Sequence, residues 1–192
     1  MSDAVRTGLD PAAKAYLDER LAAIERTLRE ERLREAPENR VTLVVFSGDL
    51  DRQLASLVIA TGAAAMGMEV TVFYTFWGLT ALKKQSILSG KTLKEKMFVA
   101  MTPANLSTMP LSKMNFGGMG RAMLTTMMKE KEIASIEELF AMARDMGVRQ
   151  VACTMSMDVM GITKEELLDG VVFGGVATFL GDAARSKVSL FI

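Results

Sequence analysis

The pattern of apolar and polar positions changes near residue 40. Before that point, residues 10–36 are rich in Arg and Glu and carry a narrow apolar stripe at 4-3-4 spacing, formed by Leu17, Leu21, Ile24 and Leu28. This pattern predicts one charged helix, with Asp10 as its cap and Pro11 in its first turn. The stripe either packs across the helix's own domain or contacts a second subunit, as the seam of a coiled coil does. The sequence supports both interpretations equally.

After residue 40 the sequence is typical of a strand, a helix and a second strand. Residues 41–46 are a continuous run of apolar and β-branched side chains, which indicates a strand covered on both faces. Residues 50–66 have apolar positions at helical spacing and end before Gly67, and residues 69–74 are again strand-like. Such a unit within about 35 residues predicts a parallel sheet with right-handed crossovers.

The remaining sequence continues this alternation. Helices are expected over residues 80–87, 120–131, 136–146, 163–168 and 175–184. Strands are expected over residues 96–101, 149–154, 171–173 and 187–191. The class is therefore α/β, with an open, mainly parallel sheet of about five strands. We divide the chain into an N-terminal helical extension, residues 1–39, and an α/β domain, residues 40–192.

Composition then excludes several kinds of chemistry. The 192 residues are 49% hydrophobic, and the counts of Lys+Arg and of Asp+Glu are both 23. A net charge of zero gives no electrostatic case for a nucleic-acid partner. Because the chain has no histidine, it cannot use Ser-His-Asp or Cys-His catalysis, and we expect no metal site.

The sequence also bears on where the protein is expected to act. The N-terminus is charged and shows no secretory signal, and a lone cysteine suits a reducing cytoplasm. No uninterrupted apolar run reaches the roughly 18 residues of a membrane span. Residues 98–128 come nearest, but prolines and a Gly-Gly pair interrupt them. We interpret this segment as a hydrophobic excursion, with peripheral membrane contact as the less favoured alternative.

Three loops follow predicted strands, where open parallel sheets bind ligands. With the residues just beyond the third loop, they supply the pocket candidates Ser47, Gly48, Asp49, Phe76, Trp77, Gly78, Thr154, Met155, Ser156, Met157 and Met160. The first loop lacks the phosphate-binding glycine pattern and the Walker lysine, so nucleotide binding is weakly supported. Its Asp49 and Asp51 are better explained as helix caps than as catalytic groups. Residues 76–78 line a pocket or pack in the core, and the sequence supports both equally.

Cys153, at the end of a predicted strand, is the only cysteine and hence the candidate nucleophile. Backbone N–H groups of a helix beginning near Ser156 would stabilise its thiolate. From position alone, a buried small hydrophobe is slightly favoured. Thirteen of the 16 methionines lie between Met97 and Met160. We prefer a soft apolar collar around Cys153 to core filler or a Cu(I) site as their explanation.

These loops resemble motifs of the DsrE/DsrF/DsrH-like family of small sulfur-relay proteins, in its branch with an enlarged, Met-rich middle. The motifs are VVFSGDLD at 44–51, VFYTFWGL at 72–79 and ACTMSMDVMGI at 152–162. Together with the elements between them, the resemblance spans residues 40–192 and leaves the N-terminal helix outside.

The resemblance implies a three-layer α/β/α fold. It also implies a homo-oligomeric sulfurtransferase-like protein that carries sulfane sulfur as a persulfide on Cys153. The implied partners are TusA-like carriers and rhodanese-type donors, and no cofactor is required. Some relatives have a second cysteine near the site; this chain has none, so any exchange must run between proteins. The alternative is a non-catalytic oligomeric scaffold or membrane-peripheral adaptor with Cys153 in its core. Flavodoxin-like binding of a nucleotide or flavin ranks third.

Overall fold

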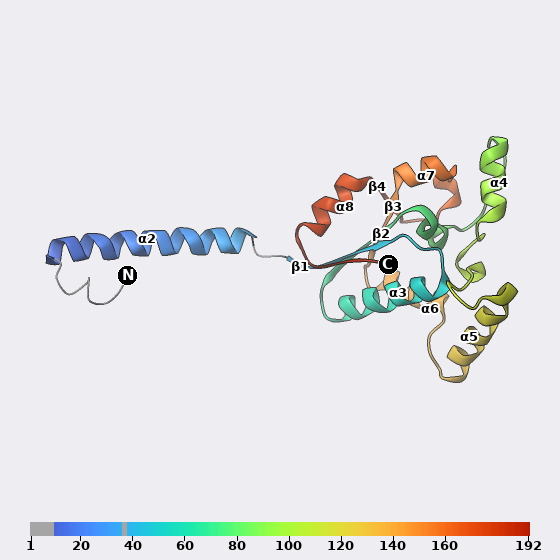
Figure 1. The fold of residues 1–192 in the computed structure, drawn as a ribbon, viewed down its shortest axis with the longest axis horizontal. Coiled ribbons are helices and arrows are strands. Elements are labelled where there is room, and N and C mark those ends of the chain that lie inside the picture. The colour runs from blue at the N-terminus through green and yellow to red at the C-terminus, as the bar shows by residue number, and fades with distance from the viewer. Residues whose placement is uncertain (1–9, 36–37) are drawn as a thin grey trace. The chain divides into compact units, whose positions relative to one another are not determined.

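The computed structural model describes residues 10–35 and 38–192. The chain divides into two units, with the boundary after residue 37, and each is described by itself (Figure 1). The described residues of the first unit form helix α2 (Pro11–Glu35), which confirms the predicted charged helix. Residues 1–9 and 36–37 of the predicted extension lie outside the described residues.

The second unit is built on a five-stranded sheet in the order β4-β3-β2-β1-β5, with every neighbouring pair parallel. The strands are β1 (Glu38–Val45), β2 (Glu69–Tyr74), β3 (Arg149–Cys153), β4 (Val172–Gly174) and β5 (Ser186–Phe191). Residues 41–45 of β1 are all buried, as a strand covered on both faces requires. The predicted α/β class with a parallel sheet of about five strands is confirmed.

Helices cover the two faces of this sheet to different extents (Figure 1). α3 (Leu50–Ala65) and α6 (Ile136–Asp145) lie together on one face, and α8 (Val176–Ala183) lies on the other. α7 (Thr154–Met160) continues directly from β3. α4 (Leu93–Met101) and α5 (Met119–Glu130) lie toward the carboxyl ends of the strands. None of the described helices is both long and apolar enough to cross a lipid bilayer.

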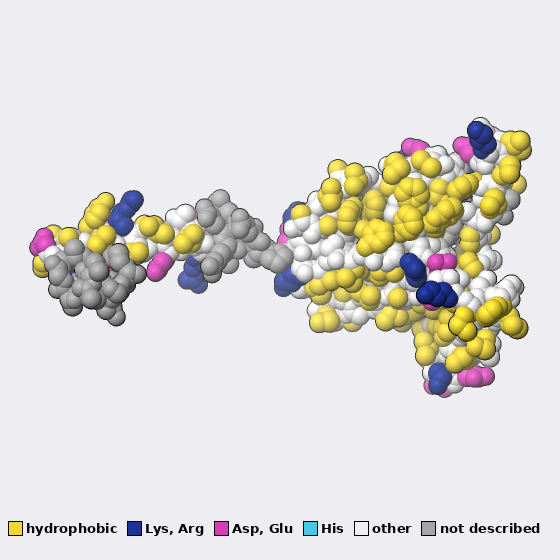
Figure 2. All heavy atoms as spheres, viewed as in Figure 1, with side chains coloured by type: hydrophobic (Ala, Val, Ile, Leu, Met, Phe, Trp, Pro, Cys, Tyr) yellow, Lys and Arg dark blue, Asp and Glu magenta, His cyan; other side chains and the backbone are white. Residues whose placement is uncertain are grey.

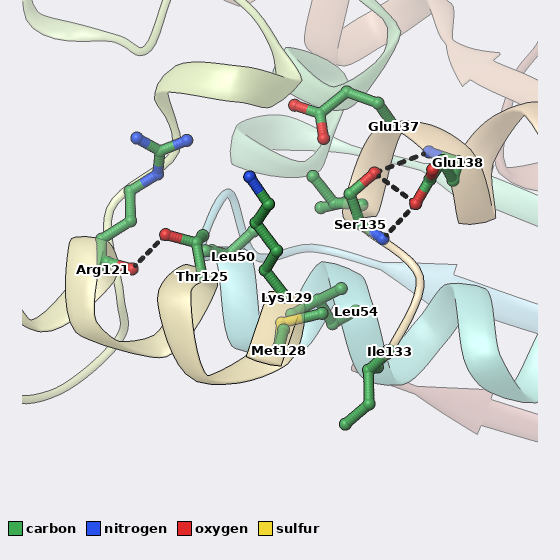
Figure 3. Close-up of a pocket in the computed structure, with 11 residues that line it drawn as sticks. Leu50, Leu54, Arg121, Thr125, Met128, Lys129, Ile133, Ser135, Glu137 and Glu138 are labelled. Atoms are coloured by element: carbon green, nitrogen blue, oxygen red, sulfur yellow. Dashed lines mark hydrogen bonds between the residues drawn. The ribbon is translucent and has the colours of Figure 1, made fainter. Parts of the chain in front are cut away.

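Several of these helices begin where the sequence predicts. At the start of α6, Ser135 Oγ accepts a hydrogen bond from the Glu138 backbone N–H, and Glu138 Oε2 accepts one from the Ser135 N–H at 2.7 Å (Figure 3). This reciprocal pair satisfies two backbone donors that the first turn of a helix leaves free. A Ser followed three residues later by Glu was therefore a reliable signal for this boundary.

The strand predicted over residues 96–101 is wrong, because this segment belongs to helix α4. Thr92 and Glu95 form a capping box at its start: Glu95 Oε2 accepts a hydrogen bond from the Thr92 backbone N–H at 2.6 Å. A short apolar run does not distinguish a strand from a helix by its period. The cap four residues upstream of the run decides the outcome.

The helix predicted over residues 80–87 is also largely wrong. A 3-10 helix, η1 (Phe76–Leu82), ends where the prediction had scarcely begun. Beyond it, Lys83 pairs with Leu167 in an isolated antiparallel bridge, and the Lys84 N–H donates to the Glu166 carbonyl at 2.9 Å. The backbone donors of this segment are thus satisfied by a neighbouring segment rather than by a helical turn.

The buried apolar side chains form two unequal clusters. The larger one fills the space between the sheet, α3 and α6, and includes the fully buried Leu43, Val45 and Leu57. The smaller cluster lies on the other face and consists of Val44, Phe73, Val151 and Cys153, with Phe179 of α8 packed against it. The lone cysteine is therefore part of the thinly covered face of the sheet.

Candidate functional site

Cys153 lies at the carboxyl edge of the sheet, as the last residue of β3 and the cap position of α7. Its extended backbone lets the chain pass from strand to helix without an intervening loop. The helix begins at Thr154, two residues earlier than the start expected near Ser156. The Cys153 side chain is 4% exposed and lies beside Val44, Phe73 and Val151 on the face that α8 covers.

A surface hollow of about 340 Å³ borders the cysteine. It is lined by Val44, Phe73, Thr75, Cys153, Met155, Val176, Phe179, Ser189, Leu190 and Phe191. Three of these side chains are largely exposed: Met155 at 55%, Val176 at 67% and Phe191 at 72%. The thiol is therefore buried among apolar neighbours but borders a hollow whose lining reaches the surface.

The hollow is almost uncharged. Among the described residues that line it, Cys153 is the one ionisable group, and Thr75 and Ser189 add hydroxyls. The Thr75 hydroxyl lies 2.8 Å from the buried Ser156 hydroxyl, which links β2 to α7 beside the cysteine. Such a lining suits a neutral or sulfur-bearing group on the thiol better than a charged small substrate, which would be left without a counter-charge.

The first and second predicted loops pack tightly against each other. A Cβ added at Gly48 would lie 2.9 Å from the Trp77 carbonyl oxygen, and one at Gly78 would lie 2.1 Å from the Val45 carbonyl oxygen. Both positions therefore need glycine for close backbone approach. Ser47 Oγ donates to Asp49 Oδ2 at 2.7 Å, so these two side chains satisfy each other within the loop.

The two aspartates of the first loop take different roles. Asp49 occupies the cap position of α3 but makes no side-chain capping bond. Asp51 instead accepts hydrogen bonds from the Ser112 backbone N–H, at 2.9 Å, and from the Ser112 hydroxyl. Burial acts to raise the pKa of Asp51, and the Ser112 bonds outweigh it and lower the pKa overall. Asp51 thus fastens the loop before η3 (Phe116–Gly118) to α3.

Aromatic contacts connect the second loop to its surroundings. The Phe46 ring lies 5.4 Å from the Phe76 ring and 6.0 Å from the Phe191 ring. Of these three residues, Phe191 lines the hollow, so Phe76 is connected to it only through Phe46 and Phe191. The Trp77 ring stacks on Phe98 of α4 at 5.4 Å. Trp77 therefore anchors α4 and does not line the hollow beside Cys153.

In the third segment, Met155 lines the hollow beside Cys153. Thr154 is exposed, Ser156 is buried, and Met157 and Met160 pack in the larger core. The structure adds residues that the sequence interpretation missed, among them Thr75, Phe179 and Phe191. Thr75 directly follows a predicted strand, so the rule that such loops bind ligands could have identified it. Nothing in the sequence connects Phe179 or Phe191 to Cys153.

The structure does not contain the methionine collar predicted around Cys153. Met155 is the one methionine that lines this hollow among the described residues. Met119, Met123 and Met127 follow one another at four-residue spacing on α5 and line a different hollow of about 520 Å³, with Phe116. The methionine-rich segment therefore builds its own apolar surface.

A third hollow, of about 310 Å³, lies between α5 and the start of α6 (Figure 3). Three of its polar side chains have structural partners: Ser135 and Glu138 form the α6 cap, and Arg121 donates to the Ser107 carbonyl. Among the described residues, no group of three or more His, Cys, Asp or Glu side chains is arranged to hold a metal ion. We take the hollow beside Cys153 as the candidate site because it borders the one thiol of the chain.

The fold and the site define a small α/β protein that presents a single thiol at the carboxyl edge of a parallel sheet. The chain belongs to the DsrE/DsrF/DrsH-like family, whose sequence model matches residues 37–191. That assignment confirms the resemblance seen in the three motifs. The match leaves all of α2 outside the family domain.

This chain matches two relatives over nearly the full length of each relative. The uncharacterised protein YrkE of Bacillus subtilis (strain 168) is 47% identical over 154 residues, which is 80% of this chain and 96% of YrkE. The sulfur carrier protein DsrE2 of Allochromatium vinosum is 33% identical over 168 residues, covering 81% of this chain and 99% of DsrE2. The crystal structure of the ychN protein from E. coli matches 80% of this chain and 98% of its own, with a TM-score of 0.46 and 11% identity.

Proposed function

We propose that the protein is a sulfur carrier that holds sulfane sulfur as a persulfide on Cys153 and passes it between partner proteins. The observation that carries this proposal is the position of the single thiol, which borders an uncharged apolar hollow at the edge of the sheet. Membership of the family, and a relative named a sulfur carrier protein, support the same role.

The proposed step is a thiol exchange. The Cys153 thiolate attacks the outer sulfur of a donor persulfide, R–S–SH; a new S–S bond forms, the donor S–S bond breaks, and the donor leaves as its thiolate. A second thiolate then attacks the outer sulfur of Cys153–S–SH and restores the free cysteine. Both steps conserve electrons, so neither an oxidant nor a cofactor is needed.

The hollow suits the loaded state. Its volume of about 340 Å³ leaves space for one added sulfur atom beside Cys153. Phe73 and Phe179, whose rings lie 5.6 Å apart, shield this space with apolar surface. Since the chain has no other cysteine, an intramolecular disulfide cannot discharge the persulfide. We propose TusA-like carriers and rhodanese-type donors as the partners, acting in a reducing compartment.

The test is mass spectrometry of the intact protein after incubation with a persulfide donor. We expect an adduct of one sulfur atom, about 32 Da, that disappears on reduction. Cys153→Ser should give no adduct, and adding an acceptor thiol should remove the adduct from the wild-type protein. No adduct on a thiol that reacts with a small alkylating reagent would overturn the proposal.

A second candidate, a non-catalytic scaffold with Cys153 as core, is favoured by the 4% exposure of that side chain. Native-state titration with a thiol reagent separates the two functions. A carrier requires Cys153 to react in the folded protein within the time of the assay, whereas a scaffold cysteine reacts only at the rate of unfolding.

We also propose that the α8 face makes a homo-oligomer contact. Hydrophobic side chains gather on this side of the domain (Figure 2), and the exposed ones include Val176 and Leu180 of α8, Val172, which pairs with Val151, and Phe191, which pairs with Val44. A monomeric protein seldom exposes so continuous an apolar surface. Sedimentation velocity should give an oligomer for the wild-type chain and a smaller species for Leu180→Asp. A monomeric wild-type chain contradicts this part of the proposal.

A further inference from the structure

Helix α2 presents an apolar stripe that no neighbouring side chain of the helix covers. The side chains of residues 18–30 are all exposed, and Leu21, Ile24 and Leu28 are 40%, 50% and 53% exposed. A helix of this kind gains most of its stability by packing its apolar face against something else. The family match begins only at residue 37, so the stripe is not part of the shared domain.

The spacing of the stripe defines positions of a heptad. Leu17, Leu21, Ile24 and Leu28 alternate at four and three residues, which places Leu21 and Leu28 at a and Leu17 and Ile24 at d. Two flanking residues then fall at the positions that decide orientation. Arg20 lies at g and Glu25 at e of the same short stretch.

We infer that α2 associates with α2 of a second copy of this chain, parallel and in register. Parallel pairing places each g residue opposite the e residue five positions on in the other helix. Arg20 then faces Glu25 of the second copy, and the symmetry of the contact forms this pair of opposite charges twice. In an antiparallel pair g faces g and e faces e, so Arg20 and Glu25 would not meet. Charge complementarity thus selects the parallel arrangement.

The inference does not depend on the proposed sulfur chemistry, because it uses a different part of the chain. It is tested in the full-length protein carrying Cys153→Ser, so that an introduced cysteine is the only thiol. Leu21→Cys places this thiol at an a position, where parallel helices in register bring identical residues together. Ala22→Cys, one residue further and directed away from the seam, is the matched control.

Under mild oxidation we expect Leu21→Cys to form disulfide-linked dimers at least about tenfold faster than Ala22→Cys, because pairing raises the effective thiol concentration. Equal rates for the two variants overturn the inference, and the stripe then covers part of its own chain. Far-ultraviolet circular dichroism of both variants checks that α2 is still helical.

Charge reversal tests the register separately. In the Leu21→Cys background, Arg20→Glu or Glu25→Arg alone places like charges opposite each other, and each should slow cross-linking about fivefold at low salt. The double variant with both reversals restores opposite charges and should return the rate to within about twofold of the parent. If the double variant is as slow as the singles, the parallel register is overturned.

Discussion

Val44 and Val45 are consecutive residues of β1, and they lie on opposite faces of the sheet in contrasting surroundings. Val45 is fully buried in the core beneath α3 and α6. Val44 lies beside Cys153 and lines the hollow under α8. One face is covered by two helices, and the other is covered by one short helix that leaves a hollow next to the Cys153 thiol. The comparison teaches that the site is the place where the packing is incomplete.

Charge is buried on the α8 side as well, but not in the hollow. Asp182 of α8 is 5% exposed and pairs with Arg40 at 2.9 Å. The described residues that line the hollow beside Cys153 include no Asp, Glu, Lys or Arg.

A second buried carboxylate is Glu166, which accepts hydrogen bonds from Lys91 Nζ at 2.7 Å and from the Ile87 and Thr163 N–H groups at 2.8 Å. Burial lowers the pKa of Lys83, and the charge of nearby Glu166 opposes that shift.

The largest effect on stability is therefore expected from Glu166→Gln. The variant leaves Lys91 buried without its counter-charge, which should lower the free energy of unfolding by about 3–5 kcal/mol. Urea denaturation measures the loss, and Glu165→Gln, the exposed neighbour, is the matched control. A loss no greater than that of the control would mean that the fold does not depend on the ion pair between Glu166 and Lys91.

The pH dependence of that effect has a defined sign. Burial acts to raise the pKa of Glu166, but the bonds from Lys91, Ile87 and Thr163 outweigh it and lower the pKa overall. A carboxylate with a lowered folded-state pKa adds stability above its unfolded-state pKa and loses it as the pH falls through the folded-state value. The difference between wild type and Glu166→Gln should hence be full at neutral pH and shrink below about pH 4.

Much of this architecture could be predicted because its signals are local. The apolar run in β1 and the Ser135–Glu138 cap of α6 each act within a few residues, and both elements formed as expected. The segment 96–101 failed because an apolar run of that length fits either period, and the deciding cap at Thr92 lay outside it. Local patterns thus fixed element types only where one signal dominated.

The surroundings of Cys153 were harder to predict, because they come from distant parts of the chain. The end of β3 could be placed at the sheet edge from the alternation of elements alone. Phe179 and Phe191 reach the same hollow only because α8 packs on this face of the sheet and β5 pairs with β1. The methionines of α5 were expected there and lie elsewhere, since composition gives no direction to a side chain.

The paired valines test the comparison directly. Val45→Ala removes two methyl groups from a sealed core and should cost about 2.5 kcal/mol in the free energy of unfolding. Val44→Ala opens onto an existing hollow and should cost about 1 kcal/mol, since less packing is lost. Urea denaturation of both variants under the same conditions measures the difference. Equal costs would show that the α8 face is as closed in solution as the α3–α6 face.

A similarly small change in stability, and the sharpest test of access, is expected from Phe179→Ala. Phe179 of α8 is partly buried and packs against Phe73, within the group of side chains that encloses Cys153. Removing its ring should cost about 1 kcal/mol, because the ring is not fully enclosed. It should also raise the rate at which Cys153 reacts with a thiol reagent by about fivefold or more, since access limits that reaction.

Val58→Ala is the control for this change, because Val58 lies on α3, outside the α8 face, and is 55% exposed. We expect neither its stability nor its thiol reactivity to differ from wild type. Far-ultraviolet circular dichroism should show that both variants keep the native helix content, so that unfolding does not account for the faster reaction. An unchanged rate in Phe179→Ala would mean that the thiol is reached by another route. The α8 face would then be a packing surface, and the contrast between the two faces would no longer locate the site.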